Sequence, residues 1–215
     1  MKRYIREPIN GLTHLFGAVL SLFGLIALVV KAAETADSTL VIMAVVIFGV
    51  SMILLYAASA TYHMVIATDS VIAFLRRIDH SMIFILIAGT YTPLCLISMK
   101  GVTGWTLFAI VSTIAFLGVI FKLVWFHAPR WLSTALYVAM GWIVVFFSST
   151  LAPVLGPNGM LMLFLGGLFY TLGALIYWRK PKLLSFKHFG FHEIFHIFIL
   201  FGSLFHFICV YAYVL

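Results

Sequence analysis

The sequence predicts an all-α, polytopic membrane protein: a seven-transmembrane helix bundle with a cytoplasmic N-terminus. Three observations predict this fold, namely the composition, the length of the apolar runs and the placement of the basic residues. Of the 215 residues, 64% are hydrophobic and 9% are charged, whereas soluble domains average about 45–50% apolar and 25% charged residues. With two cysteines and six prolines, the chain is neither a disulfide scaffold nor a collagen. The composition therefore excludes soluble, disordered and fibrous proteins.

Seven apolar runs follow one another along the chain, each close to the roughly 20 residues that a transmembrane helix needs. The predicted spans are 12–30, 40–62, 78–98, 105–125, 131–151, 160–178 and 191–215. The short gaps carry helix-breaking residues, which are Pro129, Pro153, Gly156, Pro157 and Pro181. Because almost nothing is left over for a soluble domain, we expect residues 1–215 to form a single transmembrane domain.

The first run, 12–30, has a competing interpretation as a cleaved signal peptide, since Lys2 and Arg3 precede it. Its apolar part is longer than the apolar core of about 7–15 residues that is typical of a signal peptide. The segment Lys31-Ala-Ala-Glu34 is a poor cleavage site, and cleavage would leave an even number of spans. We therefore expect an uncleaved first helix.

The basic residues predict the orientation of the bundle. If seven helices alternate in direction, most of the 13 Lys and Arg residues fall on the side of the N-terminus. Those on that side are Lys2, Arg3, Arg6, Arg76, Arg77, Lys122, Arg130, Arg179, Lys180, Lys182 and Lys187, and the opposite side has Lys31 and Lys100. By the positive-inside rule the N-terminus is cytoplasmic and Leu215 faces outward. The net charge of +7 is spread over separate gaps, which argues against nucleic acid as a partner.

Polar residues are scarce in the spans, and several gather at the predicted cytoplasmic ends. Ser59 and His63 are four residues apart and share one helix face, as do His192 and His196. Asp79 opens the third predicted span at the same end. Ionisable residues at membrane depth are costly and often functional, and the orientation was assigned without using them. We therefore expect these groups to lie together at one depth.

Three of these histidines predict a metal site. Three neutral imidazoles with an open fourth position are the arrangement of a catalytic zinc ion, and we expect His63, His192 and His196 to be its ligands. Asp79 is then an outer carboxylate that holds the zinc-bound water, with Ser59 as its hydrogen-bonding neighbour. All-nitrogen ligation with carboxylate support suits Zn2+, although iron or cobalt could also occupy such a site.

The other histidines are expected to have different roles. His14 and His80 are candidates for partners around the metal ligands. His206 lies on the same predicted span as two of the ligands but about 21 Å further along the helix than the first of them, so we expect it to form a hydrogen bond within the bundle. His127 and His188 are expected at the surface.

Four parts of the sequence carry a family resemblance. They are Glu7-Pro-Ile-Asn-Gly-Leu-Thr-His14, Ser59-Ala-Thr-Tyr-His63, Arg77-Ile-Asp-His80 with Gly89-Thr-Tyr-Thr-Pro93, and His188-Phe-Gly-Phe-His-Glu-Ile-Phe-His196. On these motifs the chain resembles the hemolysin III family over essentially its whole length. That family is grouped with the progestin and adipoQ receptors, within a superfamily of membrane hydrolases that includes alkaline ceramidases.

The resemblance implies a seven-helix bundle with zinc on the cytoplasmic side. It implies His63, His192 and His196 as ligands, Asp79 at the metal-bound water and Ser59 beside it. In the eukaryotic receptors such a site is associated with ceramide hydrolysis, and bacterial members are named for a cytolytic activity. Since no sizeable domain precedes the first span, we expect a compact bacterial member in the plasma membrane, that is, the bacterial inner membrane.

The sequence leaves three functions open. The first is a zinc-dependent hydrolase of a lipid amide or ester, with a membrane lipid as substrate. The second is a regulator of membrane state with structural zinc, which needs the same ligands. The third is a cytolytic membrane protein, although secreted pore formers must be soluble before insertion and a chain with seven apolar spans is not. The sequence indicates neither the substrate nor the oligomeric state.

Overall fold

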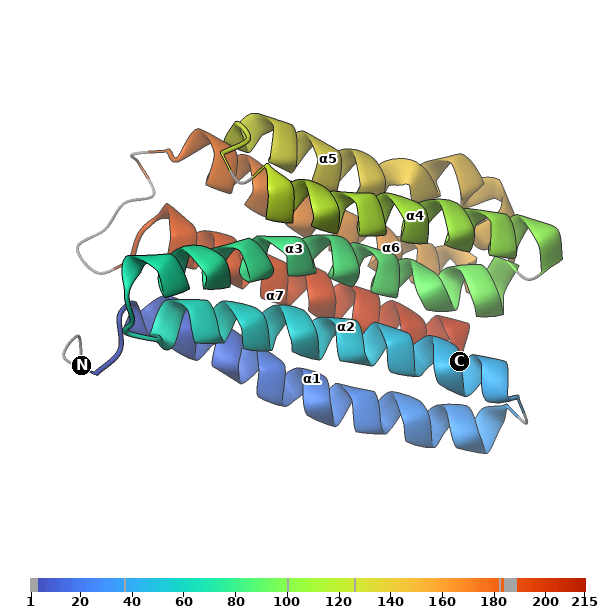
Figure 1. Cartoon of the computed structure of the whole chain (residues 1–215). Coiled ribbons are helices and arrows are strands. Elements are labelled where there is room, and N and C mark those ends of the chain that lie inside the picture. Colours follow the sequence, from blue (N-terminus) through green and yellow to red (C-terminus); the bar gives the residue numbers. More distant parts are fainter. Residues whose placement is uncertain (1–3, 37, 100, 126, 182, 184–188) are drawn as a thin grey trace.

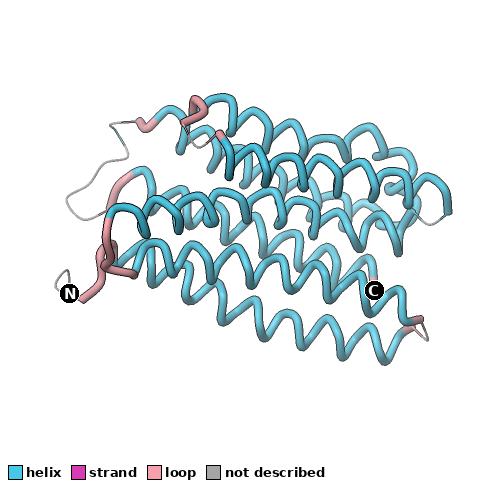
Figure 2. The backbone as a smooth tube through the Cα atoms, viewed as in Figure 1, coloured by secondary structure: helices cyan, strands magenta, loops and turns pink. Residues whose placement is uncertain are grey.

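The computed structural model describes residues 4–36, 38–99, 101–125, 127–181, 183 and 189–215. Every long element in these ranges is a helix, and the described residues include no strand (Figure 1, Figure 2). The long helices run side by side along one direction, with the N-terminus at one end of the bundle and the C-terminus toward the other (Figure 1). The predicted all-α class is confirmed.

The helical elements follow one another along the chain with short connections. The long helices are α1 (Pro8–Thr35), α2 (Thr39–Met64), α3 (Asp69–Pro93), α4 (Gly101–Val124), α5 (Arg130–Trp142), α6 (Ser148–Arg179) and α7 (Phe191–Cys209). Three short elements continue them: the π-helical η1 (Leu94–Met99) after α3, the 3-10 helix η2 (Ile143–Phe147) between α5 and α6, and the π-helical η4 (Val210–Val214) after α7. As a result, α5, η2 and α6 follow one another without a loop between them.

Six helical stretches in the described chain are long and apolar enough to cross a membrane. Five of them each correspond to one predicted span, although two end one residue before the predicted ends at 125 and 215. The remaining one, Arg130–Arg179, is 50 residues long and contains two predicted spans, 131–151 and 160–178. Its backbone leaves helical geometry at Gly156, with φ 65° and ψ 178°, a conformation that glycine adopts without steric cost. The chain reverses its direction there, so that α6 returns beside α5 (Figure 1).

The two prolines near this reversal do not interrupt the helix as the sequence analysis expected. Pro153 and Pro157 both have helical geometry, and Gly156 alone departs from it. Pro157 directly follows the break, where the first amide of a helix has no partner inside the helix in any case. The predicted gap at 152–159 therefore shrinks to one residue.

The third span begins earlier than predicted. α3 starts at Asp69 instead of residue 78, so Arg76 and Arg77 lie within the helix and not in a loop, and Asp79 lies more than two turns inside it. An acidic residue in the first turn stabilises a helix start, and Asp69 occupies that turn. The apolar pattern marks only the part that fits the bilayer, whereas the hydrogen-bonded helix continues beyond it.

Neighbouring helices pack mainly as consecutive pairs, and α7 closes the bundle. α1 packs along α2, α2 along α3, α3 along α4 and α6 along α7, while α7 also contacts α1. The largest fully buried apolar side chains include Phe48, Tyr56, Phe84, Leu107 and Met140. Large apolar side chains also face outward, among them Phe16, Phe116 and Phe146, which is typical of a surface that contacts lipid. The contact between α1 and α7 brings the first and the last long helix of the chain together, near the predicted ligands His192 and His196.

Candidate metal centre

Three histidines meet at the end of the bundle that carries the N-terminus. His63 lies one residue before the end of α2, and His192 and His196 lie on the first two turns of α7. One ring nitrogen of each lies within 4.8 Å of the other two, and the Nε2 atoms of His63 and His192 are 3.3 Å apart. His63 and His196 are 1% and 2% exposed. Within the described residues, this is the group of side chains whose geometry could hold a metal ion.

The start of α7 is held so that two histidines face α2. Glu193 accepts a hydrogen bond from the backbone amide of Gly190 at 2.8 Å, which satisfies an amide that a helix start otherwise leaves unpaired. Its other carboxylate oxygen accepts a hydrogen bond from the Asn10 side chain at 3.0 Å, which ties α7 to α1. With the helix start fixed, His192 and His196 lie one turn apart on the same face.

Glu7, to which the sequence analysis gave no role, is the hydrogen-bonding partner of His63. Its Oε2 lies 2.7 Å from the Nδ1 of His63. A carboxylate at Nδ1 keeps the imidazole proton there, so that the lone pair on Nε2 is available on the side of the other histidines. The hydrogen bond and charge of His63 lower the pKa of Glu7 to about 2, against the raising effect of partial burial. Glu7 is therefore ionised at neutral pH.

The segment before α1 is fastened to the end of α2. The backbone amide of Glu7 donates to the carbonyl of His63 at 2.9 Å. The Arg6 guanidinium donates to the carbonyl of Tyr62 and lies 4.3 Å from the centre of the Tyr62 ring. These contacts hold the Glu7 carboxylate against His63. A signal for Glu7 was present in the sequence, because Glu7, Asn10 and His14 share one helical face at the same end.

Asp79 and Ser59 lie close together beside the histidines, as predicted. Ser59 on α2 is 2% exposed, and it lines the same cavity as Asp79 on α3. The other neighbour of Asp79 is His80, whose Nε2 lies 4.0 Å from Oδ2 of Asp79. Asp79 is not one of the three clustered ligand residues, but it lines the same cavity as His192 and His196.

His14 contacts the histidine group through its ring face. The His14 and His196 rings stack at a centroid distance of 3.6 Å with an interplanar angle of 11°, and Tyr56 meets His14 edge-on at 5.1 Å. His14 is 3% exposed, and neither of its ring nitrogens has a hydrogen-bond partner in the described part of the chain. His14 thus contacts a predicted ligand by ring stacking.

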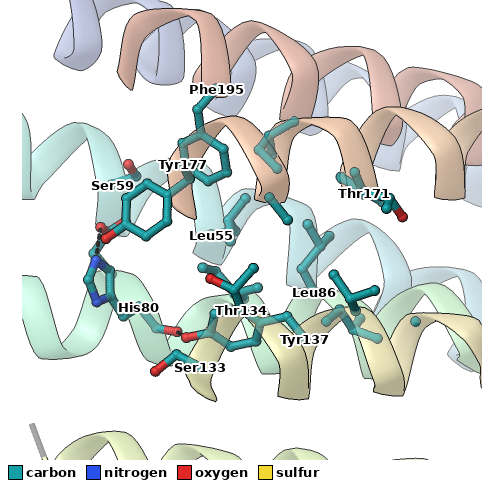
Figure 3. Close-up of a pocket in the computed structure, with 18 of the residues that line it drawn as sticks. Leu55, Ser59, His80, Leu86, Ser133, Thr134, Tyr137, Thr171, Tyr177 and Phe195 are labelled. Atoms are coloured by element: carbon teal, nitrogen blue, oxygen red, sulfur yellow. Dashed lines mark hydrogen bonds and ion pairs between the residues drawn. The ribbon is translucent and has the colours of Figure 1, made fainter. Parts of the chain in front are cut away.

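A cavity of about 170 Å³ connects these groups to the apolar interior. Its polar lining includes Ser59, Asp79, His80, His192 and His196, and its apolar lining includes Leu55, Leu86 and Ile87. Figure 3 shows Ser59, the Tyr177 hydroxyl and His80 gathered at one end of the cavity, while Leu86 lies further along it. The cavity therefore has a polar end beside the histidines and an apolar continuation.

The remaining histidines fall where the sequence analysis expected, as far as they are described. His206 lies against α6 at Gly166, where an added Cβ would come within 2.0 Å of the His206 ring. Its Nε2 is 3.2 Å from the carbonyl oxygen of Leu163, so the predicted hydrogen bond within the bundle is confirmed. His127 is exposed, and His188 lies outside the described residues.

Comparison with known proteins identifies the family. Residues 2–207 match a family model described as "Haemolysin-III related". The chain is 40% identical over 219 aligned residues to "Hemolysin-3" of Bacillus cereus, covering 100% of this chain and 95% of that protein. It is also 40% identical over 211 residues to "Hemolysin-3 homolog" of Bacillus subtilis (strain 168), covering 97% of this chain and 95% of the relative. The chain belongs to the hemolysin III family.

The family resemblance read from the four motifs is thus confirmed over the whole chain. This hemolysin III protein has six helical stretches that are able to cross a bilayer, and its bacterial relatives match it from end to end. It is a multi-pass membrane protein whose outer surface contacts lipid. The candidate metal centre lies inside its helical bundle, on α2 and α7.

Proposed function

We propose that this hemolysin III protein is a zinc-dependent hydrolase of a lipid amide or ester, held in a seven-span bundle with a cytoplasmic N-terminus. One observation carries the proposal. Two of the three clustered imidazoles, those of His192 and His196, line one cavity together with the Asp79 carboxylate and the Ser59 hydroxyl, and this cavity continues into an apolar bundle. Such a site combines the donors of a metal centre, a proton acceptor and room for a hydrocarbon chain.

The length of the stretch Arg130–Arg179 supports seven spans. As one straight helix its 50 residues would extend about 75 Å, more than twice the hydrocarbon core of about 30 Å. The reversal at Gly156 divides the stretch into two legs, each long enough to cross. An odd number of spans puts most of the Lys and Arg residues on the N-terminal side, which supports a cytoplasmic N-terminus in the bacterial inner membrane.

The donor set fits zinc. In a tetrahedral site with Zn–N bonds of about 2.0–2.1 Å, two ligand nitrogens lie about 3.3 Å apart, and the Nε2 atoms of His63 and His192 are separated by 3.3 Å. The Glu7 carboxylate at Nδ1 of His63 is the partner that metal-binding histidines usually have. When bound there, zinc lowers the pKa of coordinated water and polarises a carbonyl group.

The side chains around the histidines have distinct roles in this proposal. Asp79 accepts a proton during attack on the scissile carbonyl and returns it to the leaving group, and the Ser59 hydroxyl orients its carboxylate. Glu7 orients His63, and the stacked ring of His14 restricts rotation of His196. The apolar continuation of the cavity, at Leu55 and Leu86, accommodates a hydrocarbon chain of the substrate.

The names of the two Bacillus relatives, which both contain hemolysin-3, favour a second candidate, a cytolytic activity. In that case purified protein would make liposomes leak, and replacement of His192 would leave the leakage unchanged. The clustered histidines favour hydrolysis instead, because a pore does not require three imidazoles within 4.8 Å of one another.

The test starts with the metal content of purified protein, measured by emission spectroscopy. We expect about one zinc per chain in the wild type and a loss of most of it in His196→Ala. Release of fatty acid from N-acylated and esterified amphiphiles should require both zinc and Asp79, so that Asp79→Asn retains zinc but loses turnover. Zinc that stays in His196→Ala would overturn the metal assignment. Zinc retained without turnover on any such substrate would favour a structural metal in a regulator.

A further inference from the structure

Three basic side chains from three consecutive helices line the cavity near Asp79. They are Arg76 on α3, Lys122 on the last turn of α4 and Arg130, the first residue of α5. Asp79 is the one acidic residue among the described residues that line this cavity. The charges of all three cations act on the His80 imidazole, which itself lies beside Asp79. The polar end of the cavity therefore carries more positive than negative charge.

Lys122 is buried, so the positive charge at this end of the cavity does not all lie on a solvated surface. The residue is 5% exposed, and its ammonium donates to the Ser133 hydroxyl at 2.6 Å. Ser133 is also 5% exposed. Among the described residues Lys122 forms no ion pair with a carboxylate. A buried charge with a neutral partner is costly, so a second, negatively charged partner would stabilise it.

Tyr177 on α6 connects the other two cations at the same end. The Arg130 guanidinium lies 5.7 Å from the centre of the Tyr177 ring, and the Tyr177 hydroxyl hydrogen-bonds the side chain of Arg76. Figure 3 shows the Tyr177 ring close to His80, and their ring centres are 6.3 Å apart. Donors from α3, α4, α5 and α6 thus converge on one region, next to the candidate metal centre.

Basic residues that serve only to orient the bundle are expected at the surface. Arg179 and Lys180, at the end of α6, are exposed in this way. Lys122 differs from them because it is buried and because its side chain points to the cavity wall formed by Ser133. Orientation of the chain therefore does not account for the position of Lys122.

We propose that Arg76, Lys122 and Arg130 bind the anionic headgroup, a phosphate or a carboxylate, of an amphiphile whose hydrocarbon chain occupies the apolar part of the cavity. Lysine and arginine bind such oxyanions through charge-assisted hydrogen bonds. The apolar lining at Leu55, Leu86 and Ile87 favours an amphiphile over a free ion. Binding of an anionic amphiphile here does not require hydrolysis. That this amphiphile is the substrate, and that the substrate is therefore an anionic lipid, rests on the proposed function.

The test is a calorimetric titration of full-length, zinc-free protein in dodecyl maltoside with dodecyl phosphate, with protein-free micelles as the blank. Removing the metal with a chelator excludes binding of the phosphate through zinc. We expect Lys122→Met to weaken binding about tenfold or more, since a charged hydrogen bond is lost. Lys31→Met is the matched control, because Lys31 lies against Tyr211 outside this cavity, and it should bind like the wild type.

Arg130→Gln guards against misfolding of the Lys122 variant, because Arg130 is exposed, and it should also weaken binding. Equal affinity of wild type and both variants would overturn the proposal. Binding of inorganic phosphate as tight as that of dodecyl phosphate would overturn the assignment to an amphiphile in favour of a free anion. The titration contains no zinc, so it tests anion binding alone. A negative titration is therefore distinguishable from a negative result in the measurements of zinc content and hydrolysis.

Discussion

Two groups of buried polar side chains lie in the same bundle, and they differ in how their polar atoms are satisfied. In the deeper group, Tyr56 donates to the Ser203 hydroxyl at 2.6 Å, and the Tyr170 hydroxyl lies 2.8 Å from the same oxygen. His206 reaches the carbonyl of Leu163 at 3.2 Å. Each of these side chains has at least one partner supplied by the protein, although the Nδ1 of His206 has none among the described residues.

The group at the N-terminal end is different. Both ring nitrogens of His14 and the Nδ1 of His196 are buried without a hydrogen-bond partner in the described chain, although three other imidazole rings pack against His196. Leaving buried polar atoms unpaired costs roughly 1–3 kcal/mol each. The deeper group joins helices through its hydrogen bonds, whereas the group beside Glu7 leaves more ring nitrogens unpaired, as expected of the metal site that we propose.

The largest difference between the two groups is expected when one histidine is removed from each. His63→Ala should reduce bound zinc from about one per chain to nearly none, because a site of three protein ligands loses one. His206→Ala removes an imidazole of the same size from the deeper group and should keep its zinc. Emission spectroscopy on both purified variants gives the answer, and equal zinc loss in the two would abolish the distinction between the groups.

A smaller effect is expected from the residue that orients His63. Glu7→Gln keeps the shape of the side chain but removes the charge at Nδ1, and loss of such an outer carboxylate typically weakens metal affinity about 10–100-fold. Competition with a calibrated zinc chelator measures this change. Glu34→Gln, at the exposed far end of α1, is the control and should leave the affinity as in the wild type.

The pairing of Glu7 with His63 also predicts a pH dependence of stability. The pKa of Glu7 lies near 2 in the folded protein and near 4.5 when unperturbed, so its contribution is fully present above pH 4.5 and is lost as the pH falls toward 2. The difference in Tm between zinc-free wild type and Glu7→Gln should be constant from pH 7 to 5 and then shrink. A difference that grows on acidification would contradict the assignment.

The smallest effect is expected in the deeper group. Tyr56→Phe removes the hydroxyl that donates to Ser203 and should lower the free energy of unfolding by about 1 kcal/mol. Zinc content should not change. The Tm shift caused by Tyr56→Phe is measured in the wild type and again in Ser203→Ala. The difference between the two shifts isolates the hydrogen bond. Zinc loss in Tyr56→Phe would show that the two groups, which touch where Tyr56 packs against His14, depend on one another.

The helical class and the meeting of the histidines could be predicted from the sequence, and the structure brings His63, His192 and His196 together as expected. Hydropathy and the four-residue spacing of histidines carry this information, because both follow from the helical repeat and from the bilayer thickness. Whether the three bind zinc stays a prediction. The exact helix ends could not be predicted, since polar helix turns beyond the apolar run leave no hydropathy signal, as at Asp69 on α3.

The role of Glu7 depended on tertiary structure. Its partner His63 is 56 residues away, and only the fastening of the segment before α1 to the end of α2 brings them together. The three cations at Arg76, Lys122 and Arg130 were read from the sequence as determinants of orientation alone. Burial of Lys122 against Ser133 became visible only once α4 and α5 were packed, because burial is not encoded in the spacing of charges.

The division of the three histidines between α2 and α7 has a consequence for the order of biogenesis. A nascent chain that has inserted α1 to α6 holds one histidine of the group, and the other two follow 129 and 133 residues after it. The contacts of Asn10 with Glu193 and of α1 with α7 likewise form only after the last helix is inserted. A chain truncated before Phe191 therefore cannot assemble the group, so ion capture would report that synthesis and insertion are complete.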